Sequence, residues 1–288
     1  MSGSLQGQRV VVVGASAGIG RAAALRAASE GARVVVAARR GEALDALCRQ
    51  AGGSAHFSAV TTDVSSGSDC RRLAEHARAT LGGIDLLIYS VGYSPLRRLR
   101  DTGADEWFRV FTANVVGASQ VIQAVLPVMT PAGIIAALSS ETVGNPRIGL
   151  GAYASSKAAL EEMMRTWRLE EPQIRFCTVS VGATLPTEFG DNYDAEILVP
   201  TLLEWARCGS IQEYSMRTGM VANALVGALA AALPCPEVSM EILRLRSPAP
   251  AIAPTTDLDT VLTYASTTPE GGRVGVIGAW EADAETAQ

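Results

Sequence analysis

Cysteine, histidine and lysine are all scarce in this chain of 288 residues. The cysteines are dispersed without a CxxC pair, and only His56 and His76 could join them as metal ligands. Neither a zinc cage nor a disulfide framework is therefore expected, and a reducing, cytoplasmic location fits best. The five cysteines are Cys48, Cys70, Cys177, Cys208 and Cys235.

Charge and long apolar runs are also limited. Charged residues make up 18% of the chain, the net charge is -5, and no Lys/Arg-rich block is present, which disfavours nucleic acid as a partner. No apolar run approaches the roughly 18 residues that span a bilayer, and residues 1–9 lack a signal-peptide core. Hydrophobic residues nevertheless make up 48% of the chain, enough for a packed core. We expect a folded protein whose partner is a small molecule, not a nucleic acid or a membrane.

Only one of the 24 basic residues is a lysine, Lys157. Heavy use of arginine most simply reflects biased codon composition. A chain that takes arginine at every other basic position has kept lysine here, which marks this position for a role of its own.

Short β-branched runs alternate with longer segments of helical apolar spacing. This alternation is typical of a parallel sheet with crossover helices, and no Gly/Ser linker or repeat divides the chain. We therefore predict an α/β fold, a Rossmann-type doubly wound parallel sheet, as a single domain over residues 1–248. Strands are expected at residues 9–13, 33–37, 55–61, 84–89, 133–138, 174–181 and 240–246. Helices are expected at residues 19–30, 41–51, 68–81, 105–128, 152–171, 195–207 and 214–233.

Two segments depart from this alternation. Residues 182–200 are expected as a loop that runs into the helix at 195–207. Residues 249–288 form a C-terminal extension, whose first half is rich in Pro, Thr and Ala and is typical of a flexible tail. Arg273–Trp280 is apolar and costly to leave exposed, so we expect it to dock on the domain or on a neighbouring subunit. The extension is thus predicted to be partly docked, with residues 281–288 solvated.

A glycine-rich segment, Gly14-Ala15-Ser16-Ala17-Gly18-Ile19-Gly20, joins the first expected strand to the first helix. Glycines let the backbone approach a pyrophosphate, and free N-H groups and the helix dipole favour its negative charge. The spacing is G-x3-G-x-G, which could arise by chance in a chain with 28 glycines or serve only a tight turn. Its place between strand and helix favours a dinucleotide site that includes Gly14, Ser16, Gly18, Ile19 and Gly20.

The residues after the second strand bear on the choice of cofactor. An acidic residue there would accept from a ribose diol and indicate NAD, but the chain has Ala38, Arg39 and Arg40. Two guanidinium groups suit a 2′-phosphate, so NADP(H) is favoured over NAD(H), although both arginines could be ordinary surface charges. Asp63 and Val64 follow the third strand, where a carboxylate can accept from an adenine amino group. Asp63 is equally well a turn residue.

Tyr153 and Lys157 lie four positions apart on an expected helix, and so on one face. A nearby ammonium stabilises a phenolate and brings the pKa of tyrosine toward a useful acid/base range. Ser140 ends the preceding strand, where its hydroxyl could hold a substrate oxygen beside the phenol. With a single lysine and six tyrosines, a chance match at this spacing comes to about two per cent, which favours a catalytic pair over a surface pair.

In this order and spacing, these motifs resemble the short-chain dehydrogenase/reductase family over about residues 7–248. The resemblance implies an NAD(P)-dependent oxidoreductase in which Tyr153 is the general acid/base and Lys157 holds the nicotinamide ribose and tunes the phenol. It also implies that Ser140 orients the carbonyl or hydroxyl and that Asn114 supports a water-linked proton path. The matching residues are Gly14, Gly18, Gly20, Asp63, Asn114, Ser140, Tyr153 and Lys157.

Several positions depart from the family pattern. Val13 replaces a threonine and Val181 replaces the proline of Pro-Gly. Tyr89-Ser90-Val91-Gly92 replaces Asn-Asn-Ala-Gly, where backbone contacts can survive but Ser90 can supply only part of the second asparagine's tie to neighbouring strands. Thr187 lies one place later than the threonine that relatives place near the nicotinamide carboxamide, and it is carried over to that role.

The favoured function is an NADP(H)-dependent oxidoreductase that interconverts a ketone or aldehyde and an alcohol by hydride transfer. The alternative is a non-catalytic NADP(H)-binding regulator, which the complete catalytic set disfavours because a sensor needs no proton donor. A sugar-nucleotide epimerase or dehydratase is disfavoured by the glycine spacing. Residues 183–215 are a candidate lid over a medium-sized, largely apolar ketone, with Tyr93 and Phe189 as candidate substrate contacts, although helix packing would explain the same aromatics. Relatives commonly assemble through the helices at 105–128 and 152–171, so a homodimer or homotetramer is expected.

Overall fold

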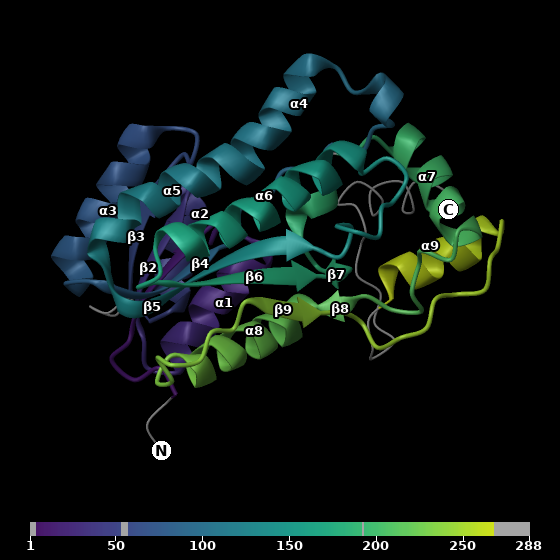
Figure 1. Cartoon of the computed structure of the whole chain (residues 1–288). Coiled ribbons are helices and arrows are strands. Elements are labelled where there is room, and N and C mark those ends of the chain that lie inside the picture. Colours follow the sequence, from purple (N-terminus) through teal and green to yellow (C-terminus); the bar gives the residue numbers. More distant parts are fainter. Residues whose placement is uncertain (1–3, 53–56, 192, 268–288) are drawn as a thin grey trace.

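The computed structural model describes residues 4–52, 57–191 and 193–267, which form one seven-stranded sheet covered by helices on both faces (Figure 1). The strands are all parallel, in the order β3-β2-β1-β4-β5-β6-β9. The predicted Rossmann-type α/β fold is confirmed. The strands are β1 (Arg9–Val13), β2 (Arg33–Ala38), β3 (Phe57–Thr61), β4 (Ile84–Tyr89), β5 (Met129–Ser140), β6 (Arg175–Val181) and β9 (Ile242–Leu245).

Helices cover both faces of the sheet, so its strands are apolar on both sides. In β1, Val10 and Val12 pack into one core with α1, α2 and α8, while Val11 and Val13 pack into the other with α3, α5 and α6. This two-sided burial explains why the central strands are continuous apolar runs. The helices are α1 (Gly18–Ser29), α2 (Gly41–Gln50), α3 (Gly67–Leu81), α4 (Ala104–Phe111), α5 (Gly117–Val125), α6 (Gly151–Glu170), α7 (Ala195–Arg207), α8 (Thr218–Ala232) and α9 (Leu258–Ser266).

The single helix expected at residues 105–128 is interrupted. A π-helical turn at Thr112–Val116 separates α4 from α5, and a 3-10 turn follows at Leu126–Val128. A π-helical turn inside a longer helix frequently marks a functional position, and this one contains Asn114. By length and composition alone the stretch Ala104–Val128 could also cross a membrane, contrary to our reading of the apolar runs. Its α5 part instead packs in the core of the sheet.

The segment expected as a loop at residues 182–200 carries short elements. β7 (Thr184–Leu185) pairs in parallel with β8 (Met216–Arg217), and a 3-10 turn follows at Glu188–Gly190. Because β8 takes part in this pairing, α8 begins later than the helix expected from residue 214. The start of the loop is therefore held by strand pairing. The loop ends where α7 begins, at Ala195, before residue 200, where it was expected to end.

The first half of the C-terminal extension differs from the flexible tail that its composition predicted. It contains α9, which packs against α7 at one end of the molecule (Figure 1). The prediction for Arg273–Trp280 concerns residues outside those that the structure describes. The predicted assembly through α4, α5 and α6 stays a prediction, and these helices expose Phe108 (71%) and Leu169 (83%).

A buried arginine joins the sheet to the end of α8. Arg175, the first residue of β6, is only 9% exposed. Its guanidinium points at the carboxyl end of α8, where a cation is favoured by the helix dipole and by unpaired carbonyl groups. It donates hydrogen bonds of 2.7 to 3.2 Å to the backbone oxygens of Ala132, Ala232, Leu233, Cys235 and Val238.

Replacing this guanidinium removes a donor from five backbone carbonyls, one of which, that of Ala232, is buried and the others partly buried. We predict that Arg175→Met lowers the free energy of unfolding by about 3 kcal/mol or more, measured by urea titration. Arg49→Met, at an exposed position on α2, is the matched control and is expected to change it by less than about 0.5 kcal/mol. Equal stabilities of the two variants would contradict this role for Arg175.

Candidate active site

A cleft of about 1200 Å³ opens at the carboxyl edge of the sheet. The ends of β1 and β4 both contribute to it, and these neighbouring strands mark the point where the strand order reverses. Open α/β sheets bind ligands at such a switch point, because connections leave the two strands in opposite directions. The volume exceeds the roughly 300 to 1000 Å³ of a site for one drug-sized ligand, so a dinucleotide and a substrate can share it.

The glycine-rich segment forms the floor of this cleft between β1 and α1. Gly14 has φ +86, and a Cβ there would lie 2.8 Å from the carbonyl carbon of Ser90. A Cβ at Gly20 would collide with the backbone oxygen of Gly14. Both glycines are therefore required by the tight turn itself. The turn also presents the start of α1 to the cleft, which Ser16, Gly18 and Ile19 line; their contact with a cofactor stays a prediction.

Arg39 and Arg40 also line the cleft, beyond the end of β2. The Arg40 guanidinium donates to both carboxylate oxygens of Glu188, at 2.9 and 2.5 Å, and to the Ser16 hydroxyl at 2.9 Å. Arg40 and Glu188 are each about half exposed, at 52% and 49% of their side-chain surface. Arg40 thus connects the segment after β7 to the glycine-rich turn across the cleft.

Asp63 lines the cleft together with Val64, and it is at the same time a turn residue. Its carboxylate accepts from the backbone N-H of Ser65 at 2.9 Å and from the Ser65 hydroxyl at 2.7 Å. These hydrogen bonds, helped by the nearby charge of Arg39, lower the pKa of Asp63. The group is therefore an ionised acceptor at neutral pH, as contact with an adenine amino group would require.

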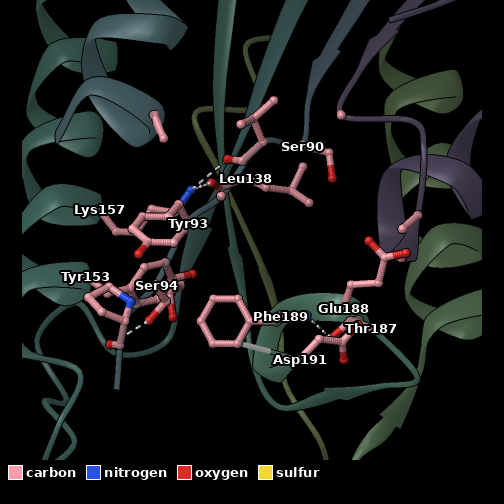
Figure 2. A pocket seen from close by; sticks show the side chains of 18 of the residues that line it. Ser90, Tyr93, Ser94, Leu138, Tyr153, Lys157, Thr187, Glu188, Phe189 and Asp191 are labelled. Atoms are coloured by element: carbon pink, nitrogen blue, oxygen red, sulfur yellow. Dashed lines mark hydrogen bonds between the residues drawn. The ribbon is translucent and has the colours of Figure 1, made fainter. Parts of the chain in front are cut away.

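The structure brings together Ser140, Tyr153 and Lys157, which sequence reasoning grouped as catalytic. Ser140 ends β5, and Tyr153 and Lys157 lie on the same side of α6 toward the cleft (Figure 2). The Lys157 ammonium lies 5.8 Å from the centre of the Tyr153 ring. It donates to the backbone oxygens of Leu138 at 2.8 Å and Val91 at 3.3 Å, which ties α6 to the ends of two strands.

Burial is the main influence on the pKa values of Tyr153 and Lys157. Tyr153 is 7% exposed, and burial raises the pKa of its phenol to about 12, against a smaller lowering by a hydrogen bond with Ser140. Burial lowers the pKa of the Lys157 ammonium to about 8. We expected Lys157 to lower the phenol pKa, but Lys157 is not among the groups that shift it here, and burial raises it. The phenol is therefore protonated at neutral pH.

Asn114 is fully buried and lies behind the cleft wall. Its side-chain oxygen accepts from the backbone N-H of Tyr93 at 2.7 Å, and its amide nitrogen donates to Tyr93 O at 2.9 Å and to the Ser156 hydroxyl at 2.8 Å. Asn114 thus holds the loop after β4 against α6, the helix that carries Tyr153 and Lys157. Its amide is engaged by protein groups, so any part in a proton path is left to its backbone carbonyl.

The unusual sequence after β4 preserves the backbone contacts, as expected. The backbone N-H of Ser90 donates to Val13 O at 2.8 Å. Tyr89 supplies a different tie: its buried phenol donates to Ala113 O at 2.9 Å and joins β4 to the π-helical turn, not to a neighbouring strand. Val181 ends β6 and lines the cleft, and Gly182 follows where a Cβ would lie 2.8 Å from a Glu141 carboxylate oxygen.

The segment after β7 covers the cleft from the side opposite α6. Thr187 accepts from the backbone N-H of Phe189, and a Cβ at Gly18 would lie only 3.6 Å from the Thr187 side chain. Phe189 extends toward Tyr153 (Figure 2), with ring centres 5.0 Å apart in an edge-to-face arrangement. Tyr193 also packs edge-to-face on Phe189, with ring centres 6.0 Å apart. Phe189 thus lies where it can contact both a substrate and the catalytic phenol.

Several cleft residues were missed by sequence reasoning. Glu106 of α4 lines the cleft and accepts from the hydroxyl of Tyr93, a predicted substrate contact, at 2.7 Å. Glu141 is 5% exposed and accepts from Arg147 at 2.6 Å, directly after Ser140. No motif signals such pairs, because spacings of 13 and 6 positions across irregular segments have no characteristic sequence pattern.

Comparison with known proteins places the chain among oxidoreductases. A family profile described as short chain dehydrogenase matches residues 8–197. Glycine betaine reductase ATRR from Emericella nidulans is 34% identical over 202 residues, which are 68% of this chain but only 16% of that protein. An uncharacterized oxidoreductase, Lmo0432 from Listeria monocytogenes, is 33% identical over 175 residues, 59% of this chain and 70% of that protein.

Solved structures with the same fold carry different cofactors. The alcohol dehydrogenase from Thermococcus sibiricus complexed with 5-hydroxy-NADP has a TM-score of 0.70 and 21% identity, over 84% of this chain and 97% of that chain. The 3-ketoacyl-(acyl-carrier-protein) reductase from Brucella melitensis complexed with NADH has a TM-score of 0.70 and 19% identity, over 83% and 97%. At these identities the likeness concerns the fold. Together with the profile match over most of the chain, it leads to one conclusion: this protein belongs to the short-chain dehydrogenase family.

Proposed function

We propose that the protein is an NADP(H)-dependent oxidoreductase that interconverts a ketone or aldehyde and an alcohol. The observation that carries this proposal is the position of the buried Tyr153 phenol. It lies beside Ser140 and Lys157, in the same cleft as the glycine-rich turn. A regulator that only binds the nucleotide has no use for a proton donor held at this place.

The residues along the cleft fit a nicotinamide dinucleotide from one end to the other. Asp63 is an ionised acceptor for the adenine, Arg39 and Arg40 are donors for a 2′-phosphate, and the N-terminus of α1 favours the pyrophosphate. Lys157 and Thr187 lie toward the nicotinamide end. When bound, the cofactor supplies or accepts the hydride. The chain's own residues orient the substrate and move the proton.

Proton transfer is assigned to Tyr153. With the pKa of its phenol at about 12, the group is neutral over the physiological range and can donate to a substrate oxygen as that oxygen gains charge. The Ser140 hydroxyl contributes a second hydrogen bond to the same oxygen. Lys157, with its pKa lowered to about 8, is charged at pH 7 and favours the negative charge left on the phenol.

Removing the phenol oxygen tests this assignment. We predict that Tyr153→Phe lowers kcat for ketone reduction by about a thousandfold or more, because it removes the proton donor. The Kd for NADP should change by less than about threefold, since only one oxygen of a buried ring is lost. A panel of ketones and alcohols, assayed with NADPH and NADP, supplies the substrate for the measurement. Turnover at the wild-type rate would remove Tyr153 from the mechanism.

The buried ammonium of Lys157 predicts a specific pH dependence of stability. Its pKa is lowered from 10.5 to about 8 on folding, so between these values the unfolded chain binds a proton that the folded chain has lost. The contribution of Lys157 to stability therefore rises with pH in this window, by at most about 1.4 kcal/mol per pH unit. In urea titrations between pH 8 and pH 10, wild type should gain stability relative to Lys157→Met. Parallel curves for the two proteins would contradict the buried charge.

Cofactor selection is predicted to depend on competition for Arg40. A 2′-phosphate must replace the Glu188 carboxylate, so Glu188→Gln should tighten NADP binding by about threefold and leave NAD binding unchanged. Arg40→Ala should weaken NADP binding by about tenfold or more. In Arg40→Ala the further change Glu188→Gln should give no gain, which separates competition from a general effect of charge. Titration calorimetry measures all four proteins, and equal affinity of wild type for NAD and NADP would overturn the choice of cofactor.

A further inference from the structure

The C-terminal part of the described chain lies behind the substrate side of the cleft. The segment 249–267 follows β9 and is well beyond residues 8–197, which the family profile matches. It ends in α9, drawn in yellow beside α7 in Figure 1. The Asp257 side chain caps this helix by accepting from the backbone N-H of Thr260 at 2.9 Å. The helix α9 therefore begins at a capping residue, Asp257, and packs against α7.

Backbone hydrogen bonds fasten the segment at both ends. The Ile252 N-H donates to Ile211 O at 2.9 Å, and the Glu213 N-H donates to Pro250 O at 3.0 Å. At the far end of the segment, the Ser215 N-H donates to Thr267 O at 3.1 Å. All three contacts lie on residues 211–215, which connect the end of α7 to β8. The extension is thus attached to the piece of chain that carries α7.

An apolar cluster, here called the lid core, fills the space between α7 and α9. Val261 of α9 is fully buried in it and Ile252 is 5% exposed. The lid core is separate from the two clusters on the faces of the sheet. Its buried members are Leu96, Leu150, Leu198, Leu202, Ala206, Ile211, Ile252 and Val261.

The front of the lid core is the wall of the cleft. Leu96 and Leu150 are buried in the lid core and also line the cleft, as do the partly buried Tyr193 and Ile197 that pack against it. Tyr193 in turn supports Phe189, which contacts Tyr153. The extension and the substrate wall are therefore two sides of the lid core. The glycine-rich turn instead packs, through Ala15, into a core on one face of the sheet.

We propose that residues 249–267 are a positioning element for the substrate wall. Their packing behind α7 holds Leu96, Tyr193 and Ile197 in place, and thereby sets substrate affinity and selectivity without acting on the cofactor half of the cleft. Where it concerns substrate affinity, this inference rests on the proposed function. It extends the active site to a segment that lies outside the family profile.

Hydrogen exchange tests the positioning role without any substrate. Val261→Ala removes two methyl groups from the lid core, so local opening of α7 should become easier. We expect amide exchange in peptides covering 195–207 to speed up by about tenfold, with α1 and the sheet strands unchanged. Unchanged exchange in α7, or equal acceleration throughout the chain, would overturn the proposal.

Val226→Ala is the matched control, because Val226 of α8 is equally buried but belongs to the core on the face of the sheet. In this variant, the ratio of amide exchange in α7 to exchange in the other elements is expected to equal that in wild type. If Val226→Ala accelerated α7 as selectively as Val261→Ala does, the lid core would not be a separate unit and the proposal would be wrong.

Kinetics then test selectivity. For the ketone with the highest kcat/KM in the NADPH panel, Val261→Ala should raise KM by about fivefold and change the Kd for NADP by less than about twofold. An unchanged KM, or a parallel loss of NADP binding, would overturn the positioning role. If no ketone or alcohol in the panel is turned over, the proposed function fails, while the exchange measurement still decides on the lid core.

Discussion

The burial of the Lys157 ammonium is the constraint on which the rest of the active site depends. A charged group with 2% of its surface exposed must be paired, and the backbone oxygens of Leu138 and Val91 supply its partners. These oxygens belong to the end of β5 and to the loop after β4. One charge therefore fixes α6, and with it Tyr153, against the edge of the sheet where the cleft opens.

This arrangement explains why arginine does not replace lysine here, in a chain that uses arginine at every other basic position. A guanidinium is planar, wider and charged at all accessible pH values, whereas the pocket between two carbonyl oxygens fits a compact ammonium. Burial shifts the two pKa values in opposite directions. It lowers the pKa of the Lys157 ammonium and raises the pKa of the Tyr153 phenol, which becomes harder to ionise. The same low-polarity surroundings thus keep the phenol protonated at pH 7 and lower the pKa of the Lys157 ammonium to about 8, so that it is still charged at this pH.

The fold and the candidate catalytic residues followed from short-range patterns, whereas much of the cleft wall did not. Strand periodicity, the glycine-rich turn and the Tyr153/Lys157 spacing are local, so they could be predicted. The pairing of Arg40 with Glu188 joins residues 148 positions apart, and the contact of Tyr89 with Ala113 depends on a π-helical turn. The direction of the Tyr153 pKa depends on burial, which only the packed structure gives. The helix α9 was missed because a Pro- and Thr-rich composition masks the few apolar residues that fold against α7.

The proposed reaction is hydride transfer to a carbonyl carbon with Tyr153 as the proton donor. The most direct measurement is deuterium transfer from NADPH deuterated at nicotinamide C4, with the alcohol product analysed by mass spectrometry. With wild type, deuterium should be found on the former carbonyl carbon, and with Tyr153→Phe no deuterated alcohol should form in the same time. Alcohol that carries no deuterium from either C4 position, or equal labelling by both proteins, would contradict the account.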